Sequence, residues 1–162
     1  MTRLAFLSPS NARADVAVVS PLSRALGPGV VDVSHLGKVE LRGSSKSVAP
    51  EAGEELLRLS PRLAILVVDG SPAEALERLA RGGVRAYDVT AALAAFELAG
   101  DDALRRLTEL DPARFPAVGS IARGTRAIFD ARGGGRYRIF VPQELGHYVA
   151  EVVGDVLRGL GR

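Results

Sequence analysis

Apolar residues in the first part of this chain recur mainly at the spacing of strands. Between Val30 and Leu41, alternating apolar positions predict one or two strands, broken near Gly37. Leu63 to Val68 is continuously apolar, which is typical of a strand covered on both faces. Tyr87 to Leu98 predicts a further strand, and Glu54 to Leu59 is interpreted as a helical turn. The three apolar segments that begin at Val30, Leu63 and Tyr87 supply the first strands of a sheet.

Helix signals alternate with these strands. Ser71-Pro72-Ala73-Glu74 predicts a capping box with Ser71 as the N-cap of a helix that runs to Arg81. Gly100-Asp101 begins a short helix, which Pro112 ends.

The last third of the chain predicts a hairpin followed by a helix. Val118 to Phe129 and Arg136 to Val141 form the two arms around Gly133-Gly134-Gly135. The final helix begins near Gln143 and places apolar residues at the spacing of one helix face. These residues are Leu145, Tyr148, Val149, Val152, Val153, Val156, Leu157 and Leu160.

The order of these elements predicts an α+β fold with two layers, in which helices lie on one side of a mixed sheet. Residues 29–162 form a single domain in this interpretation, since 162 residues suffice for one core of ordinary size. Pro9, Pro21 and Pro28 disfavour a continuous helix before it. Residues 1–28 are therefore expected to be an extended arm laid on another surface or, equally, a loosely packed terminal segment.

The amino-acid composition excludes several kinds of site but does not identify one. The chain has no cysteine, which excludes disulfides, thiolate metal sites and a cysteine nucleophile. Its two histidines, His35 and His147, are too few for a histidine zinc site, so no metal is expected. His147 and Glu151 lie four residues apart on the polar side of the last helix and predict a surface pair.

Charge and hydropathy indicate a partner other than nucleic acid or a membrane. The formal net charge is +2, and aromatic residues make up 5% of the chain, so neither a basic stripe nor a stacking surface is evident. No run approaches the roughly 20 apolar residues that span a bilayer. The N-terminus is a poor signal peptide, and a cytoplasmic location is expected.

Motifs for cofactors and nucleophiles do not fit the predicted elements. The glycine-rich stretches precede a strand or lie in a hairpin, whereas dinucleotide binding needs them between a strand and a helix. Ser34 and His35 are neighbours on a strand and point to opposite faces. Asp88 either braces backbone together with Thr90 or binds a ligand, and bracing is favoured.

Arginines gather near the hairpin. Arg136 and Arg138 share one face of their strand, and together with Arg123 and Arg126 they are candidates to bind carboxylates of a partner subunit or of a folate tail. A solvated basic hairpin is the simpler alternative. A weak internal similarity also relates Val31-Asp32-Val33-Ser34 to Tyr87-Asp88-Val89-Thr90.

From about Val31 to the end, the chain resembles the gamma subunit of heterotetrameric sarcosine oxidase, a family similar in fold to the folate-binding domain of the glycine-cleavage aminomethyltransferase. The residues that carry the resemblance are Asp88-Val89-Thr90, Phe96 to Gly100, Leu110-Asp111-Pro112, Phe115-Pro116 and the final helix with Tyr148; Leu36 to Arg42 looks like the family's first strand. Ala91-Ala92-Leu93 stands where family members carry a polar, basic element. That departure favours an assembly role over ligand binding.

The resemblance implies a non-catalytic subunit of an amine-oxidising flavoenzyme complex in one-carbon metabolism. It implies alpha, beta and delta partner subunits, with FAD, FMN, NAD and zinc held by those partners and no catalytic residue here. Asp88, Thr90, Gly100, Asp111, Pro112, Phe115 and Pro116 are then structural motif residues. The alternative is a stand-alone tetrahydrofolate-binding, aminomethyltransferase-like module. Asp88 and the arginines of the hairpin are the residues that suggest it. A basic surface protein that meets nucleic acid is a third hypothesis.

Overall fold

The structure, a computed structural model, describes residues 20, 22, 26–27 and 29–161. Most of the predicted arm over residues 1–28 therefore lies outside the described residues. Leu22 is an exception, because its side chain is fully buried in the main hydrophobic core. At this point the predicted arm belongs to the packed domain.

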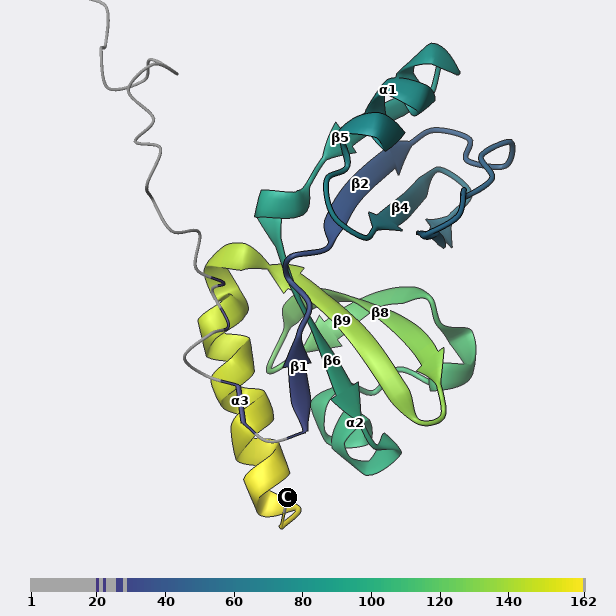
Figure 1. The fold of residues 1–162 in the computed structure, drawn as a ribbon. Coiled ribbons are helices and arrows are strands. Elements are labelled where there is room, and N and C mark those ends of the chain that lie inside the picture. The colour runs from purple at the N-terminus through teal and green to yellow at the C-terminus, as the bar shows by residue number, and fades with distance from the viewer. Residues whose placement is uncertain (1–19, 21, 23–25, 28, 162) are drawn as a thin grey trace, which may run out of the picture.

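The described residues form nine strands in two antiparallel sheets (Figure 1). The five-stranded sheet has the order β1 (Val30–Asp32), β6 (Leu93–Ala99), β9 (Arg136–Pro142), β8 (Thr125–Gly133) and β7 (Ala117–Ile121). The four-stranded sheet has the order β3 (Glu54–Ser60), β4 (Leu63–Val68), β2 (Gly37–Arg42) and β5 (Arg85–Asp88).

Helices cover the outer faces of the sheets (Figure 1). Helix α1 (Ala73–Arg81) packs on the four-stranded sheet, whereas α2 (Asp101–Leu107) and α3 (Gly146–Gly159) pack on the five-stranded sheet. Single turns of 3-10 helix, η3 (Thr90–Ala92), η4 (Pro112–Arg114) and η5 (Gln143–Leu145), join strands and helices.

The inner faces of the two sheets pack against each other. Alternation along β4 directs Ala64 and Leu66 toward α1, and Ile65 and Val67 toward the other sheet. Phe140 of β9 meets them in a small inter-sheet cluster. The prediction that Leu63 to Val68 is covered on both faces is therefore confirmed.

The α+β class is confirmed, but the strands divide into two antiparallel sheets where the prediction had one mixed sheet with helices on one side. The chain crosses between the sheets twice, at residues 33–36 and 89–92. The second crossing also interrupts the predicted strand from Tyr87 to Leu98. Strands that are neighbours in sequence are thereby separated into different layers.

Three other local predictions need correction. Glu54 to Leu59 is strand β3, because its backbone pairs with β4. The predicted strand from Val118 to Phe129 breaks at residues 122–124, where three successive residues have positive φ. Helix α2 ends at Leu107, and Pro112 instead begins η4. Long-range pairing and turn geometry outweigh local apolar spacing at these places.

Two of the predicted helices differ from their sequence patterns in detail. Pro72, not Ser71, is the N-cap of α1, and no side-chain capping hydrogen bond forms there; Pro72 is buried close to Gly37. A Cβ at residue 37 would lie 2.5 Å from the Gly70 carbonyl oxygen, so this contact requires glycine. On α3, Tyr148 is 41% exposed, and its hydroxyl donates to the Ala122 carbonyl at 3.2 Å. Leu145, which precedes the helix, is also exposed.

Candidate functional site

Two matching turns mark the crossings between the sheets. Asp32-Val33-Ser34 begins at the last residue of β1, and Asp88-Val89-Thr90 begins at the last residue of β5. In the first turn Asp32 Oδ1 accepts the backbone N–H of Ser34 at 2.9 Å, and in the second Asp88 Oδ1 accepts that of Thr90 at 2.8 Å. The weak internal similarity of the sequence therefore corresponds to two Asx turns at equivalent places.

The hydroxyl group of each turn binds backbone of the strand that follows the other crossing. Ser34 Oγ donates to the Ala95 carbonyl at 3.2 Å and accepts the Ala95 N–H at 3.0 Å, both in β6. Thr90 Oγ1 accepts the backbone N–H of Lys38 in β2 at 2.9 Å. Asp88 and Thr90 thus brace backbone in this structure, and each crossing satisfies polar backbone groups of the strand that follows the other crossing.

Replacement of Thr90 with valine is expected to lower the free energy of unfolding by about 1–3 kcal/mol, because the buried Lys38 N–H loses its acceptor. Replacement with serine keeps the hydroxyl and should cost less. Urea denaturation of both variants measures the difference. A loss in Thr90→Ser larger than that in Thr90→Val would show that the methyl group of Thr90, rather than its hydroxyl, stabilises the crossing.

Lys38 is the buried cation of this region. Its ammonium donates to the Ser34 and Leu36 carbonyls, each at 2.8 Å, so it holds the first crossing closed. The side chain is inaccessible to solvent. Burial lowers the pKa of Lys38 to about 8, and the negative charges of Asp32 and Asp88 oppose this only in part.

This lowered pKa predicts a pH dependence. Between pH 8 and the ordinary lysine pKa of about 10.4, unfolded chains bind more protons at this residue than folded ones, so stability should rise with pH. The comparison is with a Lys38→Met variant, which has no ionisable group there. Urea denaturation from pH 7 to 10 should show the difference, wild type minus variant, increasing with pH. A flat or falling difference would contradict the pKa shift.

The other predicted motif residues lie at element ends and in the core. Gly100 is the N-cap of α2 with φ 104°, a left-handed value that favours glycine. Asp111 Oδ1 accepts the Ala113 N–H at 3.0 Å and caps η4, with Pro112 as its first residue. Phe115 stacks on Phe129 at 5.4 Å between ring centroids. Pro116 follows Phe115 through a cis peptide bond.

The four candidate interface arginines do not form one surface. Arg123 and Arg126 lie at the start of β8, whereas Arg136 begins β9 at the other end of the hairpin, roughly 20 Å away for a strand of this length. All three are exposed. Arg138 is 2% exposed and is paired inside the protein, so its assignment to a partner interface is wrong. The inner face of β9 is covered by the second sheet, which sequence alternation alone does not reveal.

Arg138 belongs to an ion network that joins the two sheets. Its guanidinium donates to Asp130 of β8 at 2.7 Å and to Glu55 of β3. Arg132 of β8 also pairs with Glu55 and reaches Glu97 of β6 at 3.6 Å. We call these residues, Glu55, Glu97, Asp130, Arg132 and Arg138, the inter-sheet clamp.

Burial and pairing act oppositely on the two main carboxylates of the clamp. Burial raises the pKa of Glu55, but hydrogen bonds from Arg132 and Arg138 outweigh it and hold that pKa below its ordinary value. At Asp130 burial dominates, so its pKa is raised although Arg138 opposes the shift. Arg138 is therefore the main interaction that opposes the effect of burial on the Asp130 pKa.

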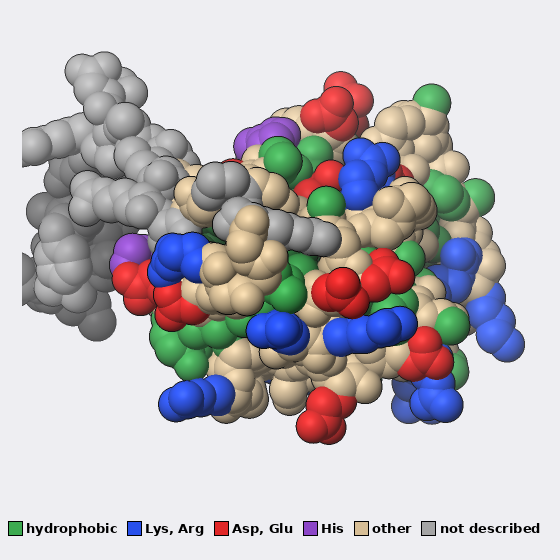
Figure 2. Space-filling view, turned by 90° about the horizontal axis from the view of Figure 1, so that it is seen from below, with side chains coloured by type: hydrophobic (Ala, Val, Ile, Leu, Met, Phe, Trp, Pro, Cys, Tyr) green, Lys and Arg blue, Asp and Glu red, His purple; other side chains and the backbone are tan. Residues whose placement is uncertain are grey.

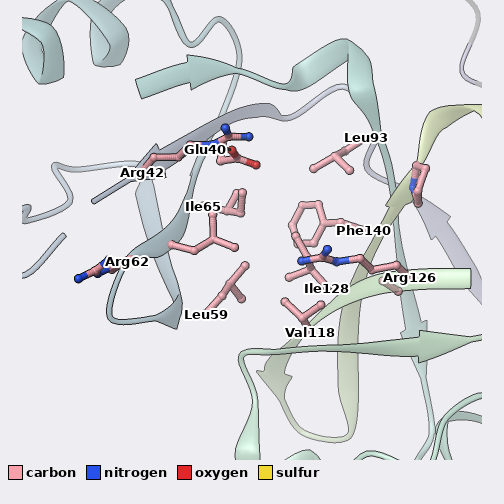
Figure 3. A pocket seen from close by; sticks show the side chains of 13 residues that line it. Glu40, Arg42, Leu59, Arg62, Ile65, Leu93, Val118, Arg126, Ile128 and Phe140 are labelled. Atoms are coloured by element: carbon pink, nitrogen blue, oxygen red, sulfur yellow. Dashed lines mark hydrogen bonds and ion pairs between the residues drawn. The ribbon is translucent and has the colours of Figure 1, made fainter. Parts of the chain in front are cut away.

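Two pockets flank the contact between the sheets. The larger, of about 860 Å³, lies at the crossings and is lined by Asp88, Thr90, Ser34, His35 and Gln143, together with Ser20 and the alanines that follow Thr90. The second, of about 480 Å³, opens between the inner faces of the sheets (Figure 3). Both fall within the size range of small-molecule sites.

Surface charges of both signs are mixed on the face drawn in Figure 2, where Lys and Arg side chains are interspersed with Asp and Glu. His147 Nε2 lies 3.2 Å from Glu151 Oε1, and both side chains are exposed, as the helix pattern predicts. Within the described residues, no group of three or more histidine or acidic side chains is placed to hold a metal ion. None of the helices described here is long and apolar enough to cross a membrane.

Sequence reasoning missed Lys38, Glu55 and Asp130. Glu55 was hidden by the interpretation of its segment as a helical turn. Asp130 has a signal in the sequence, since the hairpin register places it directly opposite Arg138. An acid and an arginine paired on one strand face indicate a buried ion pair once the second sheet is known.

Comparison with known proteins finds similarity in structure but none in sequence. No protein-family profile matches the chain, and no curated protein sequence matches it. Among solved structures, a chain of the heterotetrameric sarcosine oxidase from Corynebacterium sp. U-96, in complex with pyrrole 2-carboxylate, is similar with a TM-score of 0.70. The alignment has 15% identity and covers 90% of this chain and 97% of that chain. At this identity the likeness shows the fold.

Proposed function

We propose that this chain is a non-catalytic subunit of a hetero-oligomeric, amine-oxidising flavoenzyme complex, equivalent to a sarcosine oxidase gamma subunit. The observation that carries the proposal is the likeness over almost the full length of both chains to a component of a heterotetrameric oxidase. The whole fold, rather than a fragment of it, recurs inside such an assembly. In this proposal FAD, FMN, NAD and zinc are held by alpha, beta and delta partners.

The bonding of the motif residues supports an assembly role. Asp88, Thr90 and Asp111 bind backbone groups of their own chain, and Phe115 packs in an aromatic cluster. Their side chains stabilise crossings and turns that set the shape of the surface. A subunit that acts by its shape needs such residues and no reacting group of its own.

Co-expression with candidate alpha and beta subunits of such an oxidase tests the proposal. We expect the chain to elute with them in size-exclusion chromatography, in a fraction that shows flavin absorbance. Elution of the chain alone would overturn the proposal. Charge reversal of the exposed Arg123 and Arg136, one at a time, then shows which end of the hairpin faces a partner, with Arg105→Glu on α2 as the matched control.

A tetrahydrofolate-binding module is the second candidate function, favoured by the position of Asp88 in the larger pocket. Calorimetric titration of the chain with tetrahydrofolate tests it. Binding should weaken in Asp88→Asn, which keeps an acceptor for the Thr90 N–H but removes the charge, and should persist in Asp102→Asn on α2. Absence of heat at millimolar ligand removes this candidate.

A further inference from the structure

The two sheets are tied together at one end and separated at the other. The clamp lies at the start of β3 and along the hairpin end of β8 and β9. The pocket of about 480 Å³ lies at the opposite ends of the same strands, beside the β3–β4 turn and the start of β8. Phe140 stands between them, with the Arg138 guanidinium 5.4 Å from its ring centroid on the clamp side.

The inner surface of this pocket is apolar and comes from both sheets. Leu59 and Ile65 contribute from the four-stranded sheet, and Leu93, Ile128 and Phe140 from the five-stranded sheet (Figure 3). These belong to the small inter-sheet cluster. An occupant with an apolar body would bury its surface against side chains that the two sheets leave apart.

The rim of the pocket is positively charged. Arg42 pairs with Glu40 and lies over the Tyr87 ring, so its charge is largely neutralised within the protein. Arg62 and Arg126 form no ion pair with any described residue. Figure 3 shows the Arg126 side chain extending past Ile128 toward Phe140, while Arg62 lies at the outer rim.

We propose that this inter-sheet pocket binds a small carboxylate with an apolar body, whose carboxylate pairs with Arg126 while the body lies between the sheets. Arginine presents a planar pair of N–H donors that matches a carboxylate. A bare phosphate or sulfate would leave the apolar walls uncovered, and an amine would meet the charge of Arg126 and Arg62. The site is a different pocket from that of Asp88, although Leu93 lines both, and it does not depend on a partner subunit.

Decanoate is the probe, with decylammonium as the comparator of equal length and opposite charge. In calorimetric titrations of the full chain at pH 7, decanoate should bind at least tenfold more tightly than decylammonium. Arg126→Leu should weaken decanoate binding about tenfold, which corresponds to one charged hydrogen-bonded pair. Arg62→Leu should weaken it less, and Arg136→Leu, an exposed arginine outside the pocket, should leave it unchanged.

A second variant tests the location without changing charge. Val118 of β7 lines the pocket and is partly exposed, so Val118→Phe should fill the space and abolish decanoate binding. Unchanged melting temperatures of the variants show that the fold persists. Equal binding of decanoate and decylammonium, or full binding by Arg126→Leu or Val118→Phe, would overturn the proposal. So would the absence of heat with millimolar decanoate, an outcome that leaves the subunit proposal standing.

Discussion

Replacement of Arg138 with methionine is expected to lower the free energy of unfolding by about 3–5 kcal/mol, the cost of breaking a buried ion pair by removing one partner. Methionine occupies similar space but leaves Asp130 buried without its principal cation. Since burial already raises the pKa of Asp130, loss of Arg138 should raise it further. In this variant, either the two sheets should separate at the clamp or Asp130 should bind a proton.

Urea denaturation at pH 7 measures this loss, and two further variants identify its source. Arg136 lies on the same strand and its side chain is exposed. Arg136→Met should therefore change the free energy of unfolding by no more than about 0.5 kcal/mol. Replacing Arg138 and Asp130 together with apolar residues should recover much of the loss, because no uncompensated charge remains. If Arg138→Met cost no more than Arg136→Met, the clamp would not stabilise the packing of the sheets.

Replacement of Leu22 with alanine is the second change with a large expected effect, a loss of about 2–5 kcal/mol. Leu22 is fully buried in the cluster that joins α2, α3 and the five-stranded sheet. Its truncation should leave a cavity among side chains that are held by two helices and cannot close around it.

Thermal and urea denaturation of Leu22→Ala, with Leu26→Ala as the comparison, test this effect. Leu26 is only partly buried against the same cluster, so its truncation should cost less. Deletion of residues 1–28 should cost at least as much as Leu22→Ala, because it removes both side chains. A loss below about 0.5 kcal/mol for Leu22→Ala would place residue 22 outside the cooperative core.

The candidate site could be predicted only in part from the sequence. The Asp-Val-Ser/Thr segments were identifiable because short polar side chains after a strand favour backbone bracing, and Asp88 and Thr90 brace backbone in the structure. The partners of the Ser34 and Thr90 hydroxyls lie more than fifty residues away, in β6 and β2. Nothing in the local sequence indicates that Thr90 serves the N–H of Lys38.

Arg138 shows more clearly how little the local sequence says about distant partners. Alternation correctly separates Tyr137, Ile139 and Val141 from Arg138 and Phe140, since successive residues of a strand face opposite sides. The face that carries Arg138 was expected to be solvated. It is buried because β3 and β4 lie over it, and Glu55 supplies a counter-ion from that second sheet.

The sequence by itself determined the α+β class, the apolar strand from Leu63 to Val68, the last helix and some of the turns, among them the glycine turn at residues 133–135. These features depend on periodicity and on glycine, proline and Asx chemistry, which act over a few residues. Only the tertiary structure decided that the strands form two sheets, that Arg138 is buried in a clamp and that Arg126 borders an open pocket. Those outcomes depend on which surfaces meet after the chain has crossed twice between layers, and contacts at long sequence separation leave no local pattern.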